Sequence, residues 1–400
     1  MKATSRAPLP YPFGPADKLD LHPRYAELRE DQPMARITMP YGGEAWLATR
    51  YEDIRKLLAD PRFSRAATVG TDVPRLAPPF GDPNILSMDP PEHTRLRTLV
   101  GKAFTPGRVD RLRPQVQAIV DDLIDALIEA GQPGDLVDKL AWPLPIRVIC
   151  QLLGVPVEGQ ARFRSWVDLM LALGEEATAE SIAAAVGNLQ DYMSGLISQR
   201  RSEPTDDLLS ALVAARDDED KLSEQELVSL GVVLLAAGHE TTANQFGCHM
   251  YLLLSQPEHW HQLVADPELV PRAVEELLRY APLAVAGDDA RIATEDLELG
   301  GQLVRAGEAV VMNPALGNRD GSVFPNPDQL DFSREVNPHI AFGYGIHHCL
   351  GAPLARMELR LAIGTLARRL PELRLADPVD EVVWRTDRLV RGVRALPVMW

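Results

Sequence analysis

The chain has 400 residues, 46% of them hydrophobic, which is enough apolar material for one large core or two packed subdomains. Its 41 basic and 57 acidic residues give a formal charge of −16, which argues against nucleic acid and anionic membranes as partners. The three cysteines cannot all pair, as is typical of a reducing compartment, and no apolar run reaches the roughly 18 residues of a membrane span. Because the start also lacks an apolar leader, we expect a cytoplasmic protein without a membrane anchor.

The first predicted elements are β-strands around a glycine turn. The segments MARITMP (34–40) and EAWLAT (44–49) flank this turn and predict a hairpin, and residues 51–60 predict a helix that ends before Pro61. Residues 64–91 are rich in proline and glycine, so we expect a long loop there, whose part from Thr71 to Met88 faces the substrate.

Helical periodicity then extends over residues 93–201 with several breaks at proline and glycine. Residues 222–255 contain no proline, and Ser223 with Glu226 three residues later forms a capping-box pattern, which predicts the longest helix of the protein. A further helix is predicted over 271–280. The segment GQLVRAGEAVVMN (301–313) predicts a hairpin that turns at Ala306-Gly307, and residues 381–400 predict further short strands.

The most informative stretch is FGYGIHHCLG, residues 342–351, in which Cys349 precedes an amphipathic helix. Free amide groups and the helix dipole favour a thiolate, the form that ligates metal, and the glycines let the backbone fold tightly around the sulfur. An isolated cysteine is more often a buried structural residue, but the ten residues of patterned context make that interpretation the less favoured one here. No C-x-x-C pair is present for zinc, iron–sulfur or covalently bound haem.

The pattern F-G-x-G-x-H-x-C-x-G resembles the haem-binding loop of the cytochrome P450 family. The resemblance implies that Cys349 is the axial thiolate ligand of haem iron, that Phe342 packs beside the sulfur, that Gly343 and Gly351 shape the loop, and that His347 contacts a haem propionate. It also implies a mainly α fold with small β-sheets (α+β), with haem b between the long central helix and the cysteine loop. Residues 1–400 would form one domain, with its β-rich part at roughly 30–60 and 290–312.

A second motif, AAGHETT at 236–242, lies in the middle of the predicted long helix. Gly238 weakens a helix by about 1 kcal/mol relative to alanine, and polar residues follow it in an apolar run. A solvent-exposed polar turn is the alternative interpretation. The motif resembles the family's acid–alcohol pair, which implies that Glu240 and Thr241 deliver protons to bound oxygen and that Ala237 lies beside the haem.

Two further sets of residues match the family. EELLR resembles the E-x-x-R motif, which implies a structural cluster of Glu276, Arg279 and Arg334. His93, Arg97 and Arg291 would bind the haem propionates together with His347, although ordinary surface salt bridges are the default for any one arginine.

The resemblance implies a monooxygenase that hydroxylates or epoxidises an organic substrate, either a secondary metabolite or a xenobiotic of apolar, polyketide-like or peptide-like character. Because the chain has no nucleotide-binding G-x-G-x-x-G motif and no cluster cysteines, its electrons would come from NAD(P)H through a separate ferredoxin and ferredoxin reductase. A monomer is expected. The alternatives are a peroxygenase of the same fold and a non-catalytic haem protein that recruits a substrate.

Three groups of residues complete these expectations. Residues 173–180 are expected to form the tip of a lid. The substrate pocket is expected to be lined by Leu86, Leu234, Ala237, Leu283, Val285 and Leu389. A basic surface for an acidic ferredoxin is expected from Arg95, Arg108, Arg111, Arg113, Arg356 and Arg360.

Overall fold

The computed structural model describes residues 7–14, 17–77, 83–156, 159–173, 177–217, 221–287 and 290–400. The expected lid tip and the expected substrate loop therefore lie partly outside the described residues, at 174–176 and 78–82. No helix within the described ranges is long and apolar enough to cross a bilayer.

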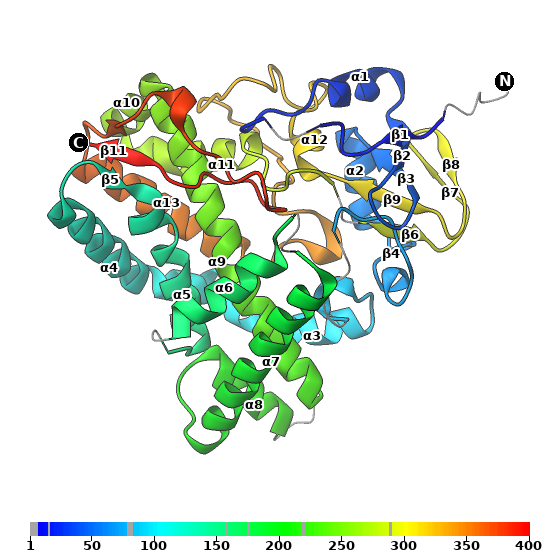
Figure 1. Cartoon of the computed structure of the whole chain (residues 1–400), viewed down its shortest axis with the longest axis horizontal. Coiled ribbons are helices and arrows are strands. Elements are labelled where there is room, and N and C mark those ends of the chain that lie inside the picture. The colour runs from blue at the N-terminus through cyan, green and yellow to red at the C-terminus, as the bar shows by residue number, and fades with distance from the viewer. Residues whose placement is uncertain are drawn as a thin grey trace.

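Helices dominate the fold, and the long helix α9 runs through the middle of the molecule (Figure 1). Their bounds are α1 Arg24–Asp31, α2 Tyr51–Ala59, α3 Glu92–Gly101, α4 Pro106–Ala130, α5 Pro143–Leu153, α6 Gln160–Met170, α7 Ala179–Ser202, α8 Leu208–Asp217, α9 Glu224–Ser255, α10 Pro257–Ala265, α11 Val270–Tyr280, α12 Pro314–Asn318 and α13 Ala352–Arg369. The predicted start of α9 is confirmed, because the Ser223 hydroxyl accepts from the Glu226 N–H while the Glu226 carboxylate accepts from the Ser223 N–H.

The strands of the largest sheet and the pair β7 and β8 gather at one side of the molecule, away from α4 and α13, whereas β5 and β11 lie near these two helices (Figure 1). Within the described ranges the largest sheet has the order β1-β2-β3-β9-β6-β4. Its strands are β1 Leu9–Pro10, β2 Met34–Thr38, β3 Glu44–Ala48, β4 Phe63–Ser64, β6 Arg291–Ala293 and β9 Ala309–Met312. Smaller sheets join β10 Arg374–Leu375, β11 Pro397–Met399 and β5 Gly134–Asp135, and join β7 Leu297–Leu299 with β8 Gln302–Val304. The predicted hairpin of β2 and β3 is confirmed.

The second predicted hairpin is wrong. Strand β8 does not pair with β9 but with β7, through a turn at Gly300 and Gly301, whose φ angles of +55° and +74° suit a tight hairpin turn. Strand β9 instead lies between β3 and β6. All four of its residues are buried, so it belongs at the centre of a sheet and not in an exposed hairpin.

The C-terminal prediction holds only in part. Residues 381–400 contain one strand, β11, together with isolated bridges that pair Trp384 with Val393 and Val390 with Ala284. The second of these bridges brings the C-terminal segment against the residues that follow α11.

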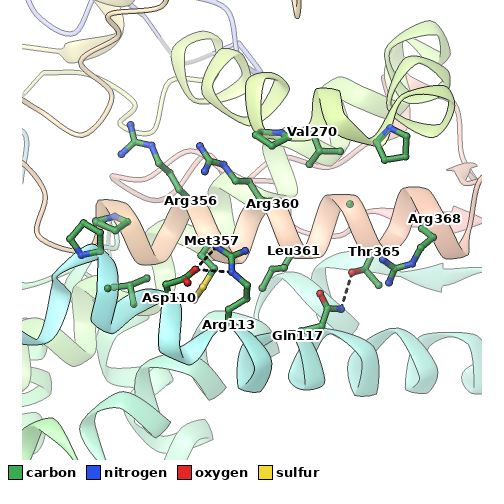
Figure 2. Close-up of a pocket in the computed structure, with 17 residues that line it drawn as sticks. Asp110, Arg113, Gln117, Val270, Arg356, Met357, Arg360, Leu361, Thr365 and Arg368 are labelled. Atoms are coloured by element: carbon green, nitrogen blue, oxygen red, sulfur yellow. Dashed lines mark hydrogen bonds and ion pairs between the residues drawn. The ribbon is translucent and has the colours of Figure 1, made fainter.

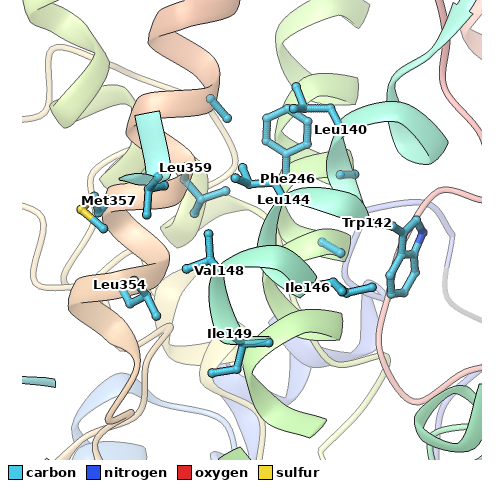
Figure 3. Close-up of a cluster of buried hydrophobic side chains, with 14 of the residues drawn as sticks. Leu140, Trp142, Leu144, Ile146, Val148, Ile149, Phe246, Leu354, Met357 and Leu359 are labelled. Atoms are coloured by element: carbon cyan, nitrogen blue, oxygen red, sulfur yellow. The ribbon is translucent and has the colours of Figure 1, made fainter. Parts of the chain in front are cut away.

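Among the described residues, the hydrophobic interior has one large cluster among the helices, another around the large sheet, and a small one of Ala172, Ala177 and Ile182. In the helical cluster, side chains from α5, α9 and α13 meet, as Val148, Phe246 and Leu359 show in Figure 3. Gly238 is part of this packing, because a Cβ at that position would lie 2.6 Å from the Ile149 Cγ1 atom. A close approach of α5 and α9 therefore explains this mid-helix glycine.

A buried ion-pair cluster ties α11 to the chain that follows α12. The Arg279 guanidinium donates to both carboxylate oxygens of Glu276, at 2.8 and 2.7 Å. It also donates to the backbone carbonyls of Asn318, Pro327 and Gln329, at 2.8, 2.7 and 3.0 Å.

Glu276 is in turn bonded from three further directions. Its carboxylate accepts from the Asp331 N–H at 3.0 Å, the Arg334 Nε at 3.2 Å and the Asn337 side-chain amide at 3.1 Å. Both Glu276 and Arg279 are buried, so each charge depends on these partners for compensation. The three residues expected to form a structural cluster therefore lie together.

We predict that Arg279→Ala lowers the free energy of unfolding by about 3–5 kcal/mol, because it leaves the Glu276 carboxylate buried without its main partner. Urea unfolding of the holoenzyme measures this. Arg24→Ala is the control, because Arg24 pairs with Glu27 at the exposed surface of α1, and its loss should lower stability by about 1 kcal/mol or less. Equal effects of the two substitutions would contradict a structural role for the buried cluster.

Candidate active site

The cysteine loop folds back on itself before α13. Gly343 and Gly345 have φ angles of +73° and +72°, and the Cys349 N–H donates to the Phe342 carbonyl at 2.8 Å. A Cβ on Gly345 would lie 2.5 Å from the Leu58 carbonyl oxygen, so this position requires glycine for contact with the end of α2 as well as for its backbone angle.

The Cys349 thiol differs from the two other cysteines because it keeps accessible surface, whereas Cys150 and Cys248 are buried. Burial among the surrounding atoms raises the pKa of Cys349, and the backbone N–H groups of Gly351 and Ala352 act in the opposite direction together with nearby positive charge. The loop amides therefore favour the thiolate, as expected, but their effect on the pKa of Cys349 is smaller than the opposite effect of burial. A bound metal cation supplies the charge that favours the thiolate.

Phe342, expected beside the sulfur, is half-buried against the helical core. Its ring faces the Arg356 guanidinium, whose carbon lies 4.4 Å from the ring centroid.

Three groups expected to bind propionates come together from separate elements. His93 belongs to α3, Arg291 to β6, and His347 to the short turn η7 (Gly345–His347). The two imidazole centroids lie 4.3 Å apart. Burial, together with the neighbouring His93 and Arg291, lowers the pKa of His347 to about 3.

These groups have hydrogen-bonding capacity to spare. The His93 Nε2, His347 Nε2 and Arg291 Nε atoms are buried and lack partners within the described part of the chain. The Arg291 Nη1 reaches only the Leu58 carbonyl, at 3.5 Å. The negative charge of Asp89 lies close enough to affect the pKa of His347. Its carboxylate already accepts a hydrogen bond from the Ser64 hydroxyl.

Arg97, the fourth expected group, donates to the His348 carbonyl. Its positive charge acts to lower the pKa of Cys349, against the larger effect of burial. Cationic and donor groups with few anionic neighbours suit a ligand that carries carboxylates. With the accessible Cys349 thiol in the same region, these residues fit a haem with its two propionates.

One face of α9 remains uncovered in the middle of an otherwise buried helix. Ala237 is exposed, and Leu234 and Thr241 are half-exposed, although the next turns on both sides are buried. The Thr241 hydroxyl donates to the Ala237 carbonyl at 2.9 Å. Since residues at i and i+4 share a helix face, Ala237 and Thr241 face the same space.

Glu240, the neighbour of Thr241, is fully buried. The alternative interpretation of this motif as a solvent-exposed polar turn is therefore wrong for Glu240. Burial raises its pKa to about 7, and the charge of Asp168 adds to this shift while Arg385 opposes it. A carboxyl group with such a pKa can both accept and donate a proton near neutrality.

The comparisons with known proteins identify the family. The family model for cytochrome P450 matches residues 163–373. Nocardicin C N-oxygenase of Nocardia uniformis subsp. tsuyamanensis is 54% identical over 394 residues, which cover 98% of this chain and 98% of that protein. The chain is a cytochrome P450.

Two more relatives of this P450 span nearly its whole length. Mycinamicin IV hydroxylase/epoxidase of Micromonospora griseorubida is 49% identical over 397 residues, covering 99% of this chain and 100% of that protein. The crystal structure of HinD with NMFT and NO has a TM-score of 0.96 and 49% identity, covering 99% of this chain and 100% of that one.

The family and the mainly α fold expected from the sequence are thus confirmed. This P450 is a haem-thiolate monooxygenase that uses haem b and receives NAD(P)H-derived electrons from an external redox partner.

The expected pocket residues come from three regions. The Val285 N–H donates to the Leu389 carbonyl at 3.0 Å, and the Arg391 N–H donates to the Leu283 carbonyl at 2.7 Å. These two backbone hydrogen bonds join the chain after α11 to the C-terminal segment, and so bring Leu283, Val285 and Leu389 close together. Leu234 and Ala237 lie on the uncovered part of α9, and Leu86 is 52% exposed on the 3-10 turn Ile85–Ser87.

The sequence analysis missed the charged neighbours of Glu240. Arg385 lies 3.6 Å from the Glu240 carboxylate, and Asp168 of α6 lies 3.4 Å from the same guanidinium. The available signal was the cluster of arginines in WRTDRLVR, residues 384–391, within a segment interpreted only as strands.

We predict that Arg291→Met weakens haem retention about 10- to 100-fold, because a propionate loses a hydrogen bond to a charged group. The haem-free protein should be equally or more stable after the change, because its buried guanidinium has a single long hydrogen bond. Haem transfer to an apo-globin and unfolding of the haem-free variant measure the two effects. Arg305→Met, at an exposed position, is the control. Equal destabilisation of both forms would contradict propionate binding.

Proposed function

We propose that this P450 hydroxylates or epoxidises a secondary metabolite of polyketide-like or peptide-like character, with Glu240 and Thr241 delivering the protons. One observation carries the proposal: a buried acid with a pKa of about 7 directly precedes a half-exposed alcohol on the uncovered part of α9. The two groups combine proton exchange near neutrality with a hydroxyl on the uncovered part of the helix.

When bound, haem supplies the oxidising chemistry, in which O2, two electrons and two protons yield one inserted oxygen atom and one water. Cys349 would hold it through its sulfur. His93, Arg97, Arg291 and His347 would bind its propionates, for which the unpartnered nitrogen atoms of His93, Arg291 and His347 have the capacity.

The proton path would start at Glu240. Its carboxyl takes a proton from water and passes it toward Thr241, whose hydroxyl can donate to an oxygen in the space beside Ala237. The present bond from Thr241 to the Ala237 carbonyl orients the hydroxyl along α9, and rotation about one side-chain bond would release it.

The substrate class is supported by the names of the relatives, which act on nocardicin C and mycinamicin IV. We propose that Leu86, Leu234, Ala237, Leu283, Val285 and Leu389 line the substrate pocket. Apolar side chains would exclude water there and leave orientation to a few polar contacts.

A ferredoxin is the proposed electron donor. The groove between α4, α13 and the start of α11 has a volume of about 860 Å³ and carries Arg113, Arg356, Arg360 and Arg368 (Figure 2). Arg356 and Arg360 are both paired with Glu275, and Arg95 is paired with Glu226, so these three do not present free charge.

Arg108 and Arg111 remain as exposed cations of α4 for which the described residues provide no ion pair. Arg113 beside them is paired with Asp110, so Arg108 and Arg111 supply the free charge that supports docking of an acidic protein through electrostatic attraction. We also propose that the protein acts as a monomer in the cytoplasm, which its three free cysteines support.

We predict that Thr241→Ala lowers the product formed per NADPH consumed, because protons no longer reach the oxygen in a directed way. The substrate is first found by a spectral screen for ligands that displace iron-bound water, followed by mass analysis of the product. Thr242→Val on the same helical turn is the control. Efficient turnover with peroxide alone that is insensitive to Thr241→Ala would indicate a peroxygenase, and binding without turnover would indicate a recruitment protein.

We predict that charge reversal of Arg108, Arg111 and Arg113 slows ferredoxin-supported reduction about tenfold or more at low salt and removes its salt dependence, because steering charges are lost. Stopped-flow reduction measures this rate. Reversal of Arg24 on α1 is the matched control. An unchanged rate with unchanged salt dependence would refute the docking site.

A further inference from the structure

Glu240 lacks the partners that a buried carboxylate normally has. Both of its carboxylate oxygens are buried and have no hydrogen-bond partner within the described residues. Among the described residues, the Arg385 Nη1 lies 3.6 Å from its Oε1, which is an ion-pair distance but not a hydrogen bond. The charged groups that face it are Asp168 and Arg164 of α6 and Arg385 and Arg388 of the C-terminal segment.

Arg385 is held from several sides at this position. Its backbone N–H donates to the Gly392 carbonyl at 2.8 Å. Its Nη2 lies 3.4 Å from the Asp168 Oδ1, and its guanidinium carbon lies 5.1 Å from the ring centroid of Trp142. Figure 3 shows Trp142 on the opposite side of the helical core from Met357. The guanidinium thus lies between two competing carboxylates, against the face of an aromatic ring.

Arg385 also borders a small cavity that reaches the surface. The cavity has a volume of about 150 Å³ and is lined by residues of the N-terminal segment, of the chain after α11 and of the C-terminal segment. Pro12, Gly14 and Thr386 on its wall are exposed, so it communicates with solvent. Since a water molecule takes up about 30 Å³ in the liquid, the cavity has room for several.

Two unused donors suit water in this place. The Trp384 Nε1 and the Arg385 Nη1 are buried atoms without a hydrogen-bond partner in the described part of the chain, and both residues line the cavity. Buried donors of this kind are commonly satisfied by ordered water.

We propose that Arg385 is a positioning residue for proton delivery: it holds the Glu240 carboxyl at the inner end of a water path from this cavity, and Asp168 competes with Glu240 for its guanidinium. The inference rests on the proposed role of Glu240. Arg385 does not carry the proton, because a guanidinium stays charged throughout the physiological range. Water in the cavity gives a proton to Glu240, and each proton that Glu240 passes toward Thr241 is replaced from the cavity.

The arrangement makes the charge of Glu240 depend on two residues with opposite effects. Arg385 favours the carboxylate, whereas Asp168 disfavours it both by its own charge and by attracting the guanidinium. Loss of Arg385 should therefore keep Glu240 protonated to a higher pH, and loss of the Asp168 charge should let it ionise at a lower pH.

Infrared titration of the holoenzyme tests this, with the carboxyl band that disappears in Glu240→Gln as the signal. We expect Arg385→Gln to move the midpoint of this band upward by about one pH unit, the usual effect of an opposite charge nearby, and Asp168→Asn to move it downward. Arg394→Gln is the control: it removes the same charge from the same segment, and its exposed guanidinium pairs with Asp387 instead. Equal midpoints in Arg385→Gln and Arg394→Gln would overturn the inference.

The water path has a separate test. Thr386→Trp places a bulky ring at the exposed wall of the cavity, so it should leave the midpoint of Glu240 in place but slow NADH-driven oxygen consumption severalfold. An unchanged rate would refute the path through this cavity. If Glu240→Gln itself left the rate of oxygen consumption unchanged, the proposed catalytic role of Glu240 would fail. If Glu240→Gln lowered this rate but Arg385→Gln did not, only the role of Arg385 would be overturned.

Discussion

The buried charges of α11 are the constraint on which the cysteine loop depends. Glu276 and Arg279 make six hydrogen bonds with residues 318–337, four with backbone groups and two with the side chains of Arg334 and Asn337. The adjacent Glu275 accepts from His339 at 3.1 Å and from Arg356 at 2.9 Å. Neighbouring carboxylates of one helix thus fix the chain on both sides of the cysteine loop. Because neither Glu276 nor Arg279 has solvent as an alternative partner, displacement of this chain would leave a charge unpaired.

The haem site combines this rigid support with groups that the protein leaves unsatisfied. Burial raises the pKa of Cys349, and the two imidazoles beside Arg291 lack partners for their Nε2 atoms. The raised pKa keeps Cys349 a neutral thiol in the protein alone, and the unpartnered nitrogen atoms are unfavourable there; a metal ion with two carboxylates would favour the thiolate and supply the missing partners. Cofactor binding and local stability are therefore coupled in the same residues.

In the middle of α9, residues 237–241 take part both in the packing of the helices and in the proposed proton transfer. Gly238 allows α5 to approach, Ala237 and Thr241 leave a face open, and Glu240 enters the interior toward Arg385. Within five positions the helix thus meets three different surroundings, which explains why the motif departs from an ordinary apolar helix.

The sequence by itself determined the family, because the cysteine loop requires its glycines and its sulfur in one short run, and it determined the limits of α9 through local capping at Ser223. It also indicated Glu276, Arg279 and Arg334, since the family motif carries them. Only the tertiary structure decided that β9 lies between β3 and β6, because strand partners distant in sequence cannot be read from alternation within one segment. Only the tertiary structure brought Asp168 and Arg385 to Glu240, since a long-range ion pair leaves no local pattern in the chain.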